Sequence, residues 1–300
     1  MRLPNILIHA QHLVLLTVVV FAVARTQDAG SDSNDGFELL PPGLHFQPLK
    51  ANHQEPRVGV LKYFGTANLK VDVGNTIDVF GYGLPSSRMR FTAGIDFMAY
   101  AFVTGAQGLR LQVDALDGFF GGNITASRQY DTHELKTRLR ILHLSAHLVD
   151  GHYSVPLQQW INNREPIAYT KDFGELVVAD EHPSEIGFLR YYVGISYATL
   201  VRPVDLERYS FLGGFEFATS EVFGGVAGQP TNAFLADHFS LTGHPGYTGN
   251  NQIQAGVKFG EWYQKGVVVY LAYYRGNSFF SEYFDERVSI VGAGFTVDFP

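Results

Sequence analysis

Apolar and polar residues alternate along most of the chain from about residue 57 onward, and turn-like clusters separate the alternating runs. Period-two runs predict β-strands because successive side chains of a strand point to opposite faces. Two runs, 153–160 and 173–179, alternate weakly. The clear runs are 58–64, 69–82, 89–103, 109–120, 139–149, 186–201, 209–223, 252–262, 267–274 and 288–299.

Together these runs predict an all-β fold, an antiparallel transmembrane β-barrel of about 12 strands. A tilted membrane strand needs about 9–11 residues, and eight of the ten clear runs are at least that long. The Gly- and Pro-rich stretch 224–250 is expected to be the longest loop. A soluble β-sandwich also alternates, so this pattern leaves it as a competing fold.

The run at 139–149 carries the candidate chemistry. Leu142, Leu144, Ala146 and Leu148 share one face, which we expect to meet lipid. The other face would then put His143, Ser145 and His147 in the lumen, and we expect a polar cluster there that includes Arg140, His147 and Asp150. Arg138 and Arg140 share the parity of the leucines, so either they lie beyond the apolar band or a bulge near Ile141 changes the register. A helix from Asp131 to Gly151, with a capping box at Asp131 and Glu134, remains an alternative.

His143 and Ser145 would lie on one face with Cα atoms about 7 Å apart, so their side chains can meet. A serine nucleophile needs an adjacent base and a third group that orients the base. Asp150, Glu134 or a carboxylate on a neighbouring strand could orient His143. His143 and His147 are about 13 Å apart on a strand, too far to share one metal ion. We predict no metal site.

The N-terminus predicts export. The apolar run Leu13–Phe21 followed by Ala22-Val23-Ala24 is typical of a cleavable signal peptide, assigned to residues 1–24. Residues 25–56 are polar and then proline-punctuated, which predicts a flexible periplasmic lead before a barrel at 57–300. The chain has no cysteine, so disulfides play no part. A net charge of -7 argues against a nucleic-acid partner.

The last run ends on alternating apolar residues, Val291, Ala293, Phe295, Val297 and Phe299, with Pro300 after them. This ending is similar to the C-terminal signal of bacterial outer-membrane barrels. The likeness implies that the barrel assembly machinery is a partner, and that outer-membrane lipid surrounds the folded chain.

Residues 139–150, with the pattern H-x-S-x-H-x-x-D from His143 to Asp150, resemble the signature of a family of bacterial outer-membrane barrels classed only as a domain of unknown function. The stretches 47–51, 55–57, 273–278 and 284–288 resemble its lead-in and last hairpin. This resemblance implies a barrel and no known activity. The His143-x-Ser145 pair is also similar to that of outer-membrane phospholipase A and the lipid A deacylases.

We therefore predict a non-enzymatic protein of the bacterial outer membrane, a narrow channel or a binding barrel without cofactors. The alternative is a lipid hydrolase with Ser145 as nucleophile and His143 as base, for which the resemblance to the phospholipase implies calcium. The direction in which His143 and Ser145 point distinguishes these two hypotheses. If both side chains point outward and a third polar group lies within hydrogen-bond distance, the hydrolase is favoured.

Overall fold

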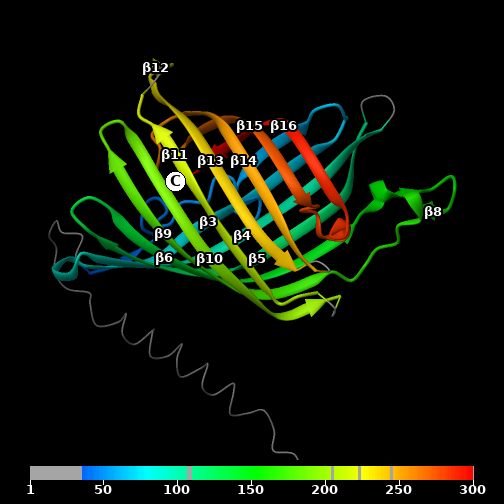
Figure 1. Cartoon of the computed structure of the whole chain (residues 1–300), viewed down its shortest axis with the longest axis horizontal. Helices are drawn as coiled ribbons and strands as arrows, with labels where there is room; N and C mark the ends of the chain where they lie inside the picture. Colours follow the sequence, from blue (N-terminus) through cyan, green and yellow to red (C-terminus); the bar gives the residue numbers. More distant parts are fainter. Residues whose placement is uncertain (1–35, 107–109, 204–205, 222–223, 244–245, 300) are drawn as a thin grey trace, which may run out of the picture.

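The computed structural model describes residues 36–106, 110–203, 206–221, 224–243 and 246–299, and its main feature is a closed ring of long β-strands (Figure 1). The expected signal peptide at 1–24 lies outside the described residues. Twelve long strands of the described chain form the ring: β2 (Val58–Tyr63), β3 (Leu69–Leu84), β4 (Met89–Ala106), β5 (Arg110–Gln129), β6 (Glu134–Leu148), β9 (Thr170–Ser184), β10 (Gly187–Arg202), β11 (Tyr209–Thr219), β13 (Gln229–Gly243), β14 (Tyr247–Phe259), β15 (Gly266–Asn277) and β16 (Arg287–Asp298).

The ring is antiparallel throughout, and each strand pairs with its neighbour in the order just given. The last strand, β16, pairs with the first, β2, from Val297 opposite Val58 to Gly292 opposite Tyr63. Because β2 also pairs with β3, and β3 with β4, no gap is left in the order of strands. The predicted all-β barrel of about 12 strands is confirmed.

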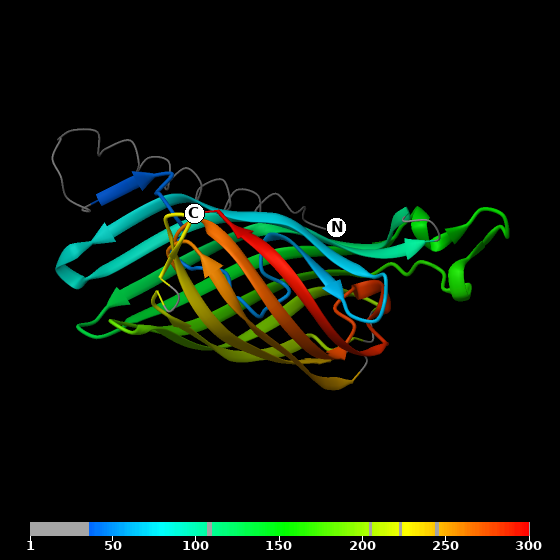
Figure 2. The same cartoon turned by 90° about the horizontal axis from the view of Figure 1, so that it is seen from above.

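The barrel has two unlike ends. At one, here called the terminal end, β2 begins and β16 ends, and the connections are short. At the other, here called the loop end, residues 149–169 join β6 to β9 and residues 278–286 join β15 to β16. Figure 2 shows the first of these loops reaching far beyond the strands. No helix within the described ranges is long and apolar enough to cross a membrane.

The short elements lie at the rims. β1 (Gly36–Leu39) pairs with the end of β3, and β12 (Gly225–Val226) with the start of β13. The long loop contains a hairpin of β7 (Tyr153–Ser154) and β8 (Gln159–Trp160). The 3-10 turns are η1 (Pro85–Ser87), η2 (Asp150–His152), η3 (Ile161–Asn163) and η4 (Ser281–Tyr283).

The outer wall carries exposed apolar side chains at every second residue. This apolar belt includes Ile77, Ile95, Phe97, Ile124, Ile141, Val193, Ile195, Val269, Leu271 and Phe295. The side chains between them are buried inside, where the terminal half is charged and the loop half is aromatic. An apolar outside around a polar and charged inside is typical of barrels that span a membrane.

Residues 40–56 fold into the barrel, so the expectation of a flexible periplasmic lead over 25–56 is wrong for this described part. Leu49 and Ala51 are fully buried, and the Glu55 side chain is 1% exposed. Charged groups on the inner wall bind this segment. The local sequence of 40–56 does not predict these contacts. We call residues 40–56 the luminal segment.

Two further expectations about strands are corrected. The run 153–160 forms only the small β7–β8 hairpin outside the barrel sheet. The expected loop 224–250 instead contains β13, whose inward residues include the polar Asn232 and His238 because they face a polar lumen. Pro230 is tolerated because it lies at the second position of the strand, opposite the short β12.

Candidate active site on the outer wall

His143, Ser145 and His147 face outward, which overturns the expected facing of β6. Burial alternates without interruption from Glu134 to Leu148, and the pairing with β5 and β9 contains no bulge here. The strand therefore also excludes the helix considered for this region. Leu142 and Leu144 are buried inside, in line with Lys136, Arg138 and Arg140.

The physical reason lies in what fills the barrel. Near the loop end the interior is an aromatic core, and Leu142 and Leu144 join the same buried cluster as Phe119 and Phe173. Nearer the terminal end the interior holds carboxylates that pair with the arginines. The inward face of β6 thus places its leucines in the aromatic core and its arginines beside the carboxylates without a change of register. The polar residues at 143, 145 and 147 consequently point outward.

The outward face brings a carboxylate to His143. Asp172 is the residue directly opposite His143 on β9, and its Oδ1 lies 2.5 Å from His143 Nδ1. Because a carboxylate can only accept, the Nδ1–H of His143 donates this hydrogen bond, which leaves Nε2 for another partner. The side chains of His143 and Asp172 are 34% and 47% exposed, so the pair is open to a molecule at the outer wall.

Ser145 lies two residues farther along the same face. Its cross-strand neighbours are Gly118 on β5 and Thr170 on β9. The Thr170 hydroxyl donates to the carbonyl of Leu144 at 2.9 Å, which turns it toward the backbone. A Cβ placed on Gly118 would meet nothing closer than the Ser145 carbonyl at 3.9 Å, so space is open beside the serine.

No hydrogen bond joins Ser145 to His143 among the described contacts. Such bonds in catalytic pairs are often long without substrate and shorten only when it binds. What the strand guarantees is a shared face and a Cα separation of about 7 Å. Ser145, His143 and Asp172 are therefore neighbours on the outer face, here called the row, in the order that a nucleophile, a base and an orienting acid would take.

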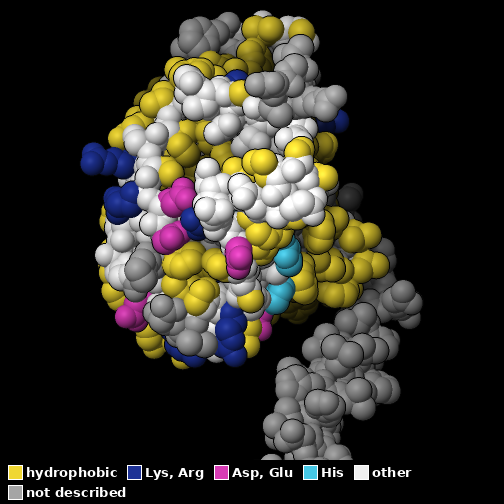
Figure 3. Space-filling view, turned by 90° about the vertical axis from the view of Figure 1, so that its right-hand side faces the viewer, with side chains coloured by type: hydrophobic (Ala, Val, Ile, Leu, Met, Phe, Trp, Pro, Cys, Tyr) yellow, Lys and Arg dark blue, Asp and Glu magenta, His cyan; other side chains and the backbone are white. Residues whose placement is uncertain are grey.

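This row lies at the border of the apolar belt. On β6 the outward residues Leu139 and Ile141 are exposed and apolar, and His143 is the first polar residue beyond them. Phe120 packs against His143 in a tilted arrangement, with ring centroids 4.9 Å apart. Figure 3, which looks at the loop end, shows histidine side chains beside a large hydrophobic area. The row thus lies at the edge of the apolar belt, on the side of the loop end.

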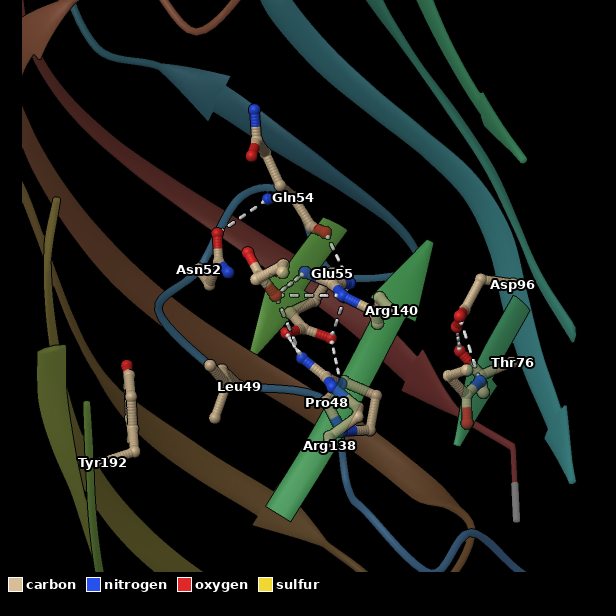
Figure 4. A network of polar contacts seen from close by, with 12 residues as sticks. Pro48, Leu49, Asn52, Gln54, Glu55, Thr76, Asp96, Arg138, Arg140 and Tyr192 are labelled. Carbon is tan, nitrogen blue, oxygen red and sulfur yellow. Dashed lines mark hydrogen bonds and ion pairs between the residues drawn. The ribbon is translucent and has the colours of Figure 1, made fainter. Parts of the chain in front are cut away.

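Of the residues expected in a lumen cluster, Arg140 is buried inside the barrel. His147 is on the outer face, and the side chain of Asp150, in η2, is not described. Inside the barrel, Arg138 makes two hydrogen bonds to Glu55 of the luminal segment at 2.5 and 3.0 Å. Arg140 donates to Glu175 at 2.6 and 3.0 Å and to the carbonyl of Gln54 at 3.1 Å (Figure 4).

Electrostatics fix the ionised state of Glu55. Burial alone would raise the pKa of its carboxyl group, but the guanidinium groups of Arg138 and Arg140 lower that pKa to about 2. Arg190 binds the same segment farther along, donating to the carbonyls of Gln47 and Pro48 at 2.9 and 3.1 Å. The segment is therefore held by ion pairs and by charge-assisted hydrogen bonds.

The described lumen is divided by the luminal segment. A cavity of about 660 Å³ lies toward the terminal end, lined by residues such as Pro42, Arg90 and Glu134. A smaller one of about 80 Å³ lies toward the loop end beside Lys171, Ser196 and His238. Residues 44–45 and 47 line the first cavity and residues 52–54 the second, so the segment passes between them.

The residues near Ser145 do not fit a calcium ion. Calcium takes six to eight oxygen ligands, usually with several carboxylates among them. In the described part of the chain, no group of three or more His, Cys, Asp or Glu side chains could hold a metal ion. Asp172 is already engaged by His143. We therefore derive no step through calcium.

Sequence reasoning missed two residues that matter here. Asp172 precedes the weak run 173–179, and only strand pairing across the loop 149–169 sets it opposite His143. Glu55 lies in the segment taken as flexible. Asp172 could have been sought from the sequence, because a catalytic His–Ser pair needs an acid that orients the histidine and a neighbouring strand can supply it.

These features define a closed antiparallel β-barrel with an apolar outer wall, on which Ser145, His143 and Asp172 form a polar row. Residues 37–299 match the family described as protein of unknown function (DUF1207), and the chain belongs to that family. No curated protein matches the chain.

Three solved structures match most of the chain, each with a TM-score below 0.5. The beta domain of the Bordetella autotransporter BrkA has a TM-score of 0.44 and 14% identity, covering 80% of this chain and 97% of that one. CymD, a monoaromatic hydrocarbon channel, has a TM-score of 0.39 and 9% identity, with 80% and 76% covered. Outer-membrane expressed OmpT of Vibrio cholerae has a TM-score of 0.30 and 9% identity, with 84% and 98% covered. The strand pairing itself establishes the barrel.

Proposed function

We propose that this barrel is a serine esterase of the bacterial outer membrane that cleaves acyl ester bonds of lipids at its outer wall. One observation carries the proposal: His143 and Ser145 face outward, and Asp172 lies 2.5 Å from the base. A nucleophile on the outside of a barrel is accessible to membrane lipid, whereas one in the lumen is not.

The chemistry is that of an acyl transfer through a covalent intermediate. Ser145 Oγ attacks the ester carbonyl carbon while its proton passes to His143 Nε2. The bond to the leaving alcohol then breaks, and His143 donates that proton to the alcohol oxygen. Water attacks the acyl-serine, gives its proton to His143, and the fatty acid leaves as the proton returns to Ser145. Asp172 holds the Nδ1–H tautomer and stabilises the transient imidazolium.

The height of the row suits a lipid ester. Ester groups of membrane lipids lie between the hydrocarbon chains and the headgroups, and His143 is the first polar residue beyond the apolar Leu139 and Ile141. Gly118 leaves room beside Ser145 for the acyl group. The acyl chain can then lie along the belt beside Phe120.

Localisation and assembly partners are part of the same proposal. Export would use the signal peptide at 1–24, and the barrel assembly machinery would recognise β16, which ends in the apolar Phe295 and Val297. Outer-membrane lipid would surround the apolar belt and would also supply the substrate. Short connections lie on the periplasmic side of such barrels, so we expect the terminal end, where β2 begins and β16 ends, to face the periplasm.

The proposal is tested with the full chain refolded in detergent and transferred to phospholipid vesicles. We expect fatty acid release that is lost in Ser145→Ala and in His143→Ala but retained in His147→Ala, which removes a histidine from the same face. Release should be measured with calcium and with a chelator, and on lipid A as well. If a demonstrably folded barrel releases no fatty acid under any of these conditions, the proposal is wrong.

The non-enzymatic alternative, a narrow channel or binding barrel, has less support. The luminal segment passes between the cavities of about 660 and 80 Å³ and so occupies part of the described lumen at this level. Conductance across a planar bilayer tests it directly: stable single-channel steps from the unmodified chain would favour the channel.

A further inference from the structure

The barrel wall is notched at the loop end above the hairpin of β2 and β3. β2 stops at Tyr63 and β3 starts at Leu69, so this hairpin is shorter than the strands on either side. Tyr63 pairs with Gly292, yet β16 starts five residues farther out, at Arg287. Leu69 pairs with Val103, while β4 continues three residues to Ala106. The flanking strands thus extend about 10–16 Å beyond the hairpin.

A mainly apolar cavity of about 330 Å³, whose lining also includes Asn68, Ser278 and Glu286, lies at this notch. Its outer lip includes Phe64 and Val291, which are 54% and 49% exposed on the outside of the barrel. Its inner wall is formed by Phe102 and by Phe279 and Phe280 of the loop 278–286. Since its lining extends from the outer face to the buried core, the cavity opens sideways through the wall.

The inner wall of the cavity is fixed in place by buried polar contacts. Ser281 donates to Asp117 at 2.6 Å, and Tyr283 donates to Asp114. The Tyr100 hydroxyl donates to the carbonyl of Phe279 at 2.9 Å. Phe102 and Phe280 pack with ring centroids 5.0 Å apart. These contacts hold the loop inside the barrel mouth, so the cavity is formed before any ligand arrives.

The mouth lies at the edge of the apolar belt. On β15 the outward residues Leu271 and Tyr273 are apolar or aromatic and the next one outward is Arg275. Tyr273 is opposite Val291 of the outer lip, and Arg275 is opposite Ser289. An occupant would therefore have its apolar part inside the wall and its polar part at the level of the headgroups.

We propose that this cavity binds the hydrocarbon chain of a single-chain amphiphile, a fatty acid or lysolipid, that enters laterally from the membrane. Continuity of the outer lip with the apolar belt selects a ligand that is dissolved in lipid rather than in water. A volume of about 330 Å³ falls at the small end of the usual range for ligand sites, roughly 300–1,000 Å³, which suits one chain rather than a two-chain lipid.

The experiment uses the full chain in phospholipid vesicles that contain a fatty acid with a photoreactive diazirine in its chain. After illumination, adducts are mapped by mass spectrometry of peptides. We expect adducts to concentrate on residues 63–68 and 278–291. Val288→Trp, which fills the cavity from the inner side of β16, should lower their yield roughly tenfold, equivalent to a loss of about 1.4 kcal/mol of binding free energy.

The matched control is Val269→Trp, which adds the same side chain to the belt away from the cavity and should leave the yield unchanged. Heat-dependent gel migration reports whether each variant has folded. Adducts spread evenly around the belt, or equal yields from both variants, would overturn the proposal. The labelling is repeated with Ser145→Ala, so that a failure of the proposed esterase activity does not affect the result.

Discussion

Neutralising Glu55 should release the luminal segment. Glu55 is the carboxylate of that segment, and it is bound by Arg138 at 2.5 and 3.0 Å and lies 3.5 Å from Arg140. With Glu175, these groups comprise two positive and two negative charges, so Glu55→Gln leaves one buried positive charge uncompensated. Removing one partner of a buried ion pair costs about 3–5 kcal/mol.

The pKa of Glu55 gives a second estimate of the free energy that is lost in Glu55→Gln. Its pKa is lowered from 4.5 to about 2, and that difference corresponds to roughly 3 kcal/mol. Because the folded-state pKa is depressed, this stabilisation is fully present above about pH 4.5 and is lost as the pH falls toward 2. Both routes give at least about 3 kcal/mol, or roughly a hundredfold change in the equilibrium between bound and released segment.

The assay exploits the absence of cysteine from the chain. Ala51→Cys introduces a single thiol at a fully buried position of the luminal segment, and a water-soluble maleimide reports its exposure. We expect slow labelling that Glu55→Gln accelerates roughly a hundredfold at neutral pH. Asp131→Asn is the control, because its ion pair with Arg88 is largely exposed and contributes at most about 1 kcal/mol. Equal labelling rates in the two variants would refute the reasoning.

Three other predictions concern the outer wall and the loop end. Asp172→Asn should lower the rate of fatty acid release by a factor of about 10²–10⁴ with unchanged gel migration, because it removes the carboxylate that orients His143. Full activity in this variant would show that Asp172 has no such role. Gly118→Ala should keep activity and Gly118→Leu should lose it, because only the longer side chain fills the space beside Ser145; the refolded variants are compared by fatty acid release, and a fully active Gly118→Leu would contradict the placement of the acyl group. Tyr283→Phe should lower the free energy of unfolding by about 1–3 kcal/mol, measured by urea titration in detergent, because it leaves buried Asp114 without one donor; an unchanged midpoint would show that water replaces the hydroxyl.

The alternating pattern by itself determined the class of fold. Strand period is a local property, so ten of the twelve barrel strands could be located before any tertiary contact was known, and 173–179 marked an eleventh. The alternating pattern did not predict the strand 229–243, because its inward residues include the polar His238 and Asn232. Such residues can face inward only where the lumen is polar. That His143 and Ser145 share a face was also readable, because residues two apart on a strand lie on the same face whichever way it turns.

Which way that face turns was decided by the tertiary structure. Leu142 and Leu144 suit lipid and an aromatic interior equally well, so hydropathy alone cannot distinguish the two faces of β6. The parity of Arg138 and Arg140 became decisive only once Glu55 and Glu175 stood opposite them. Asp172 and the luminal segment are likewise products of contacts between residues distant in sequence, and the free energy of such contacts depends on partners that a local pattern does not contain.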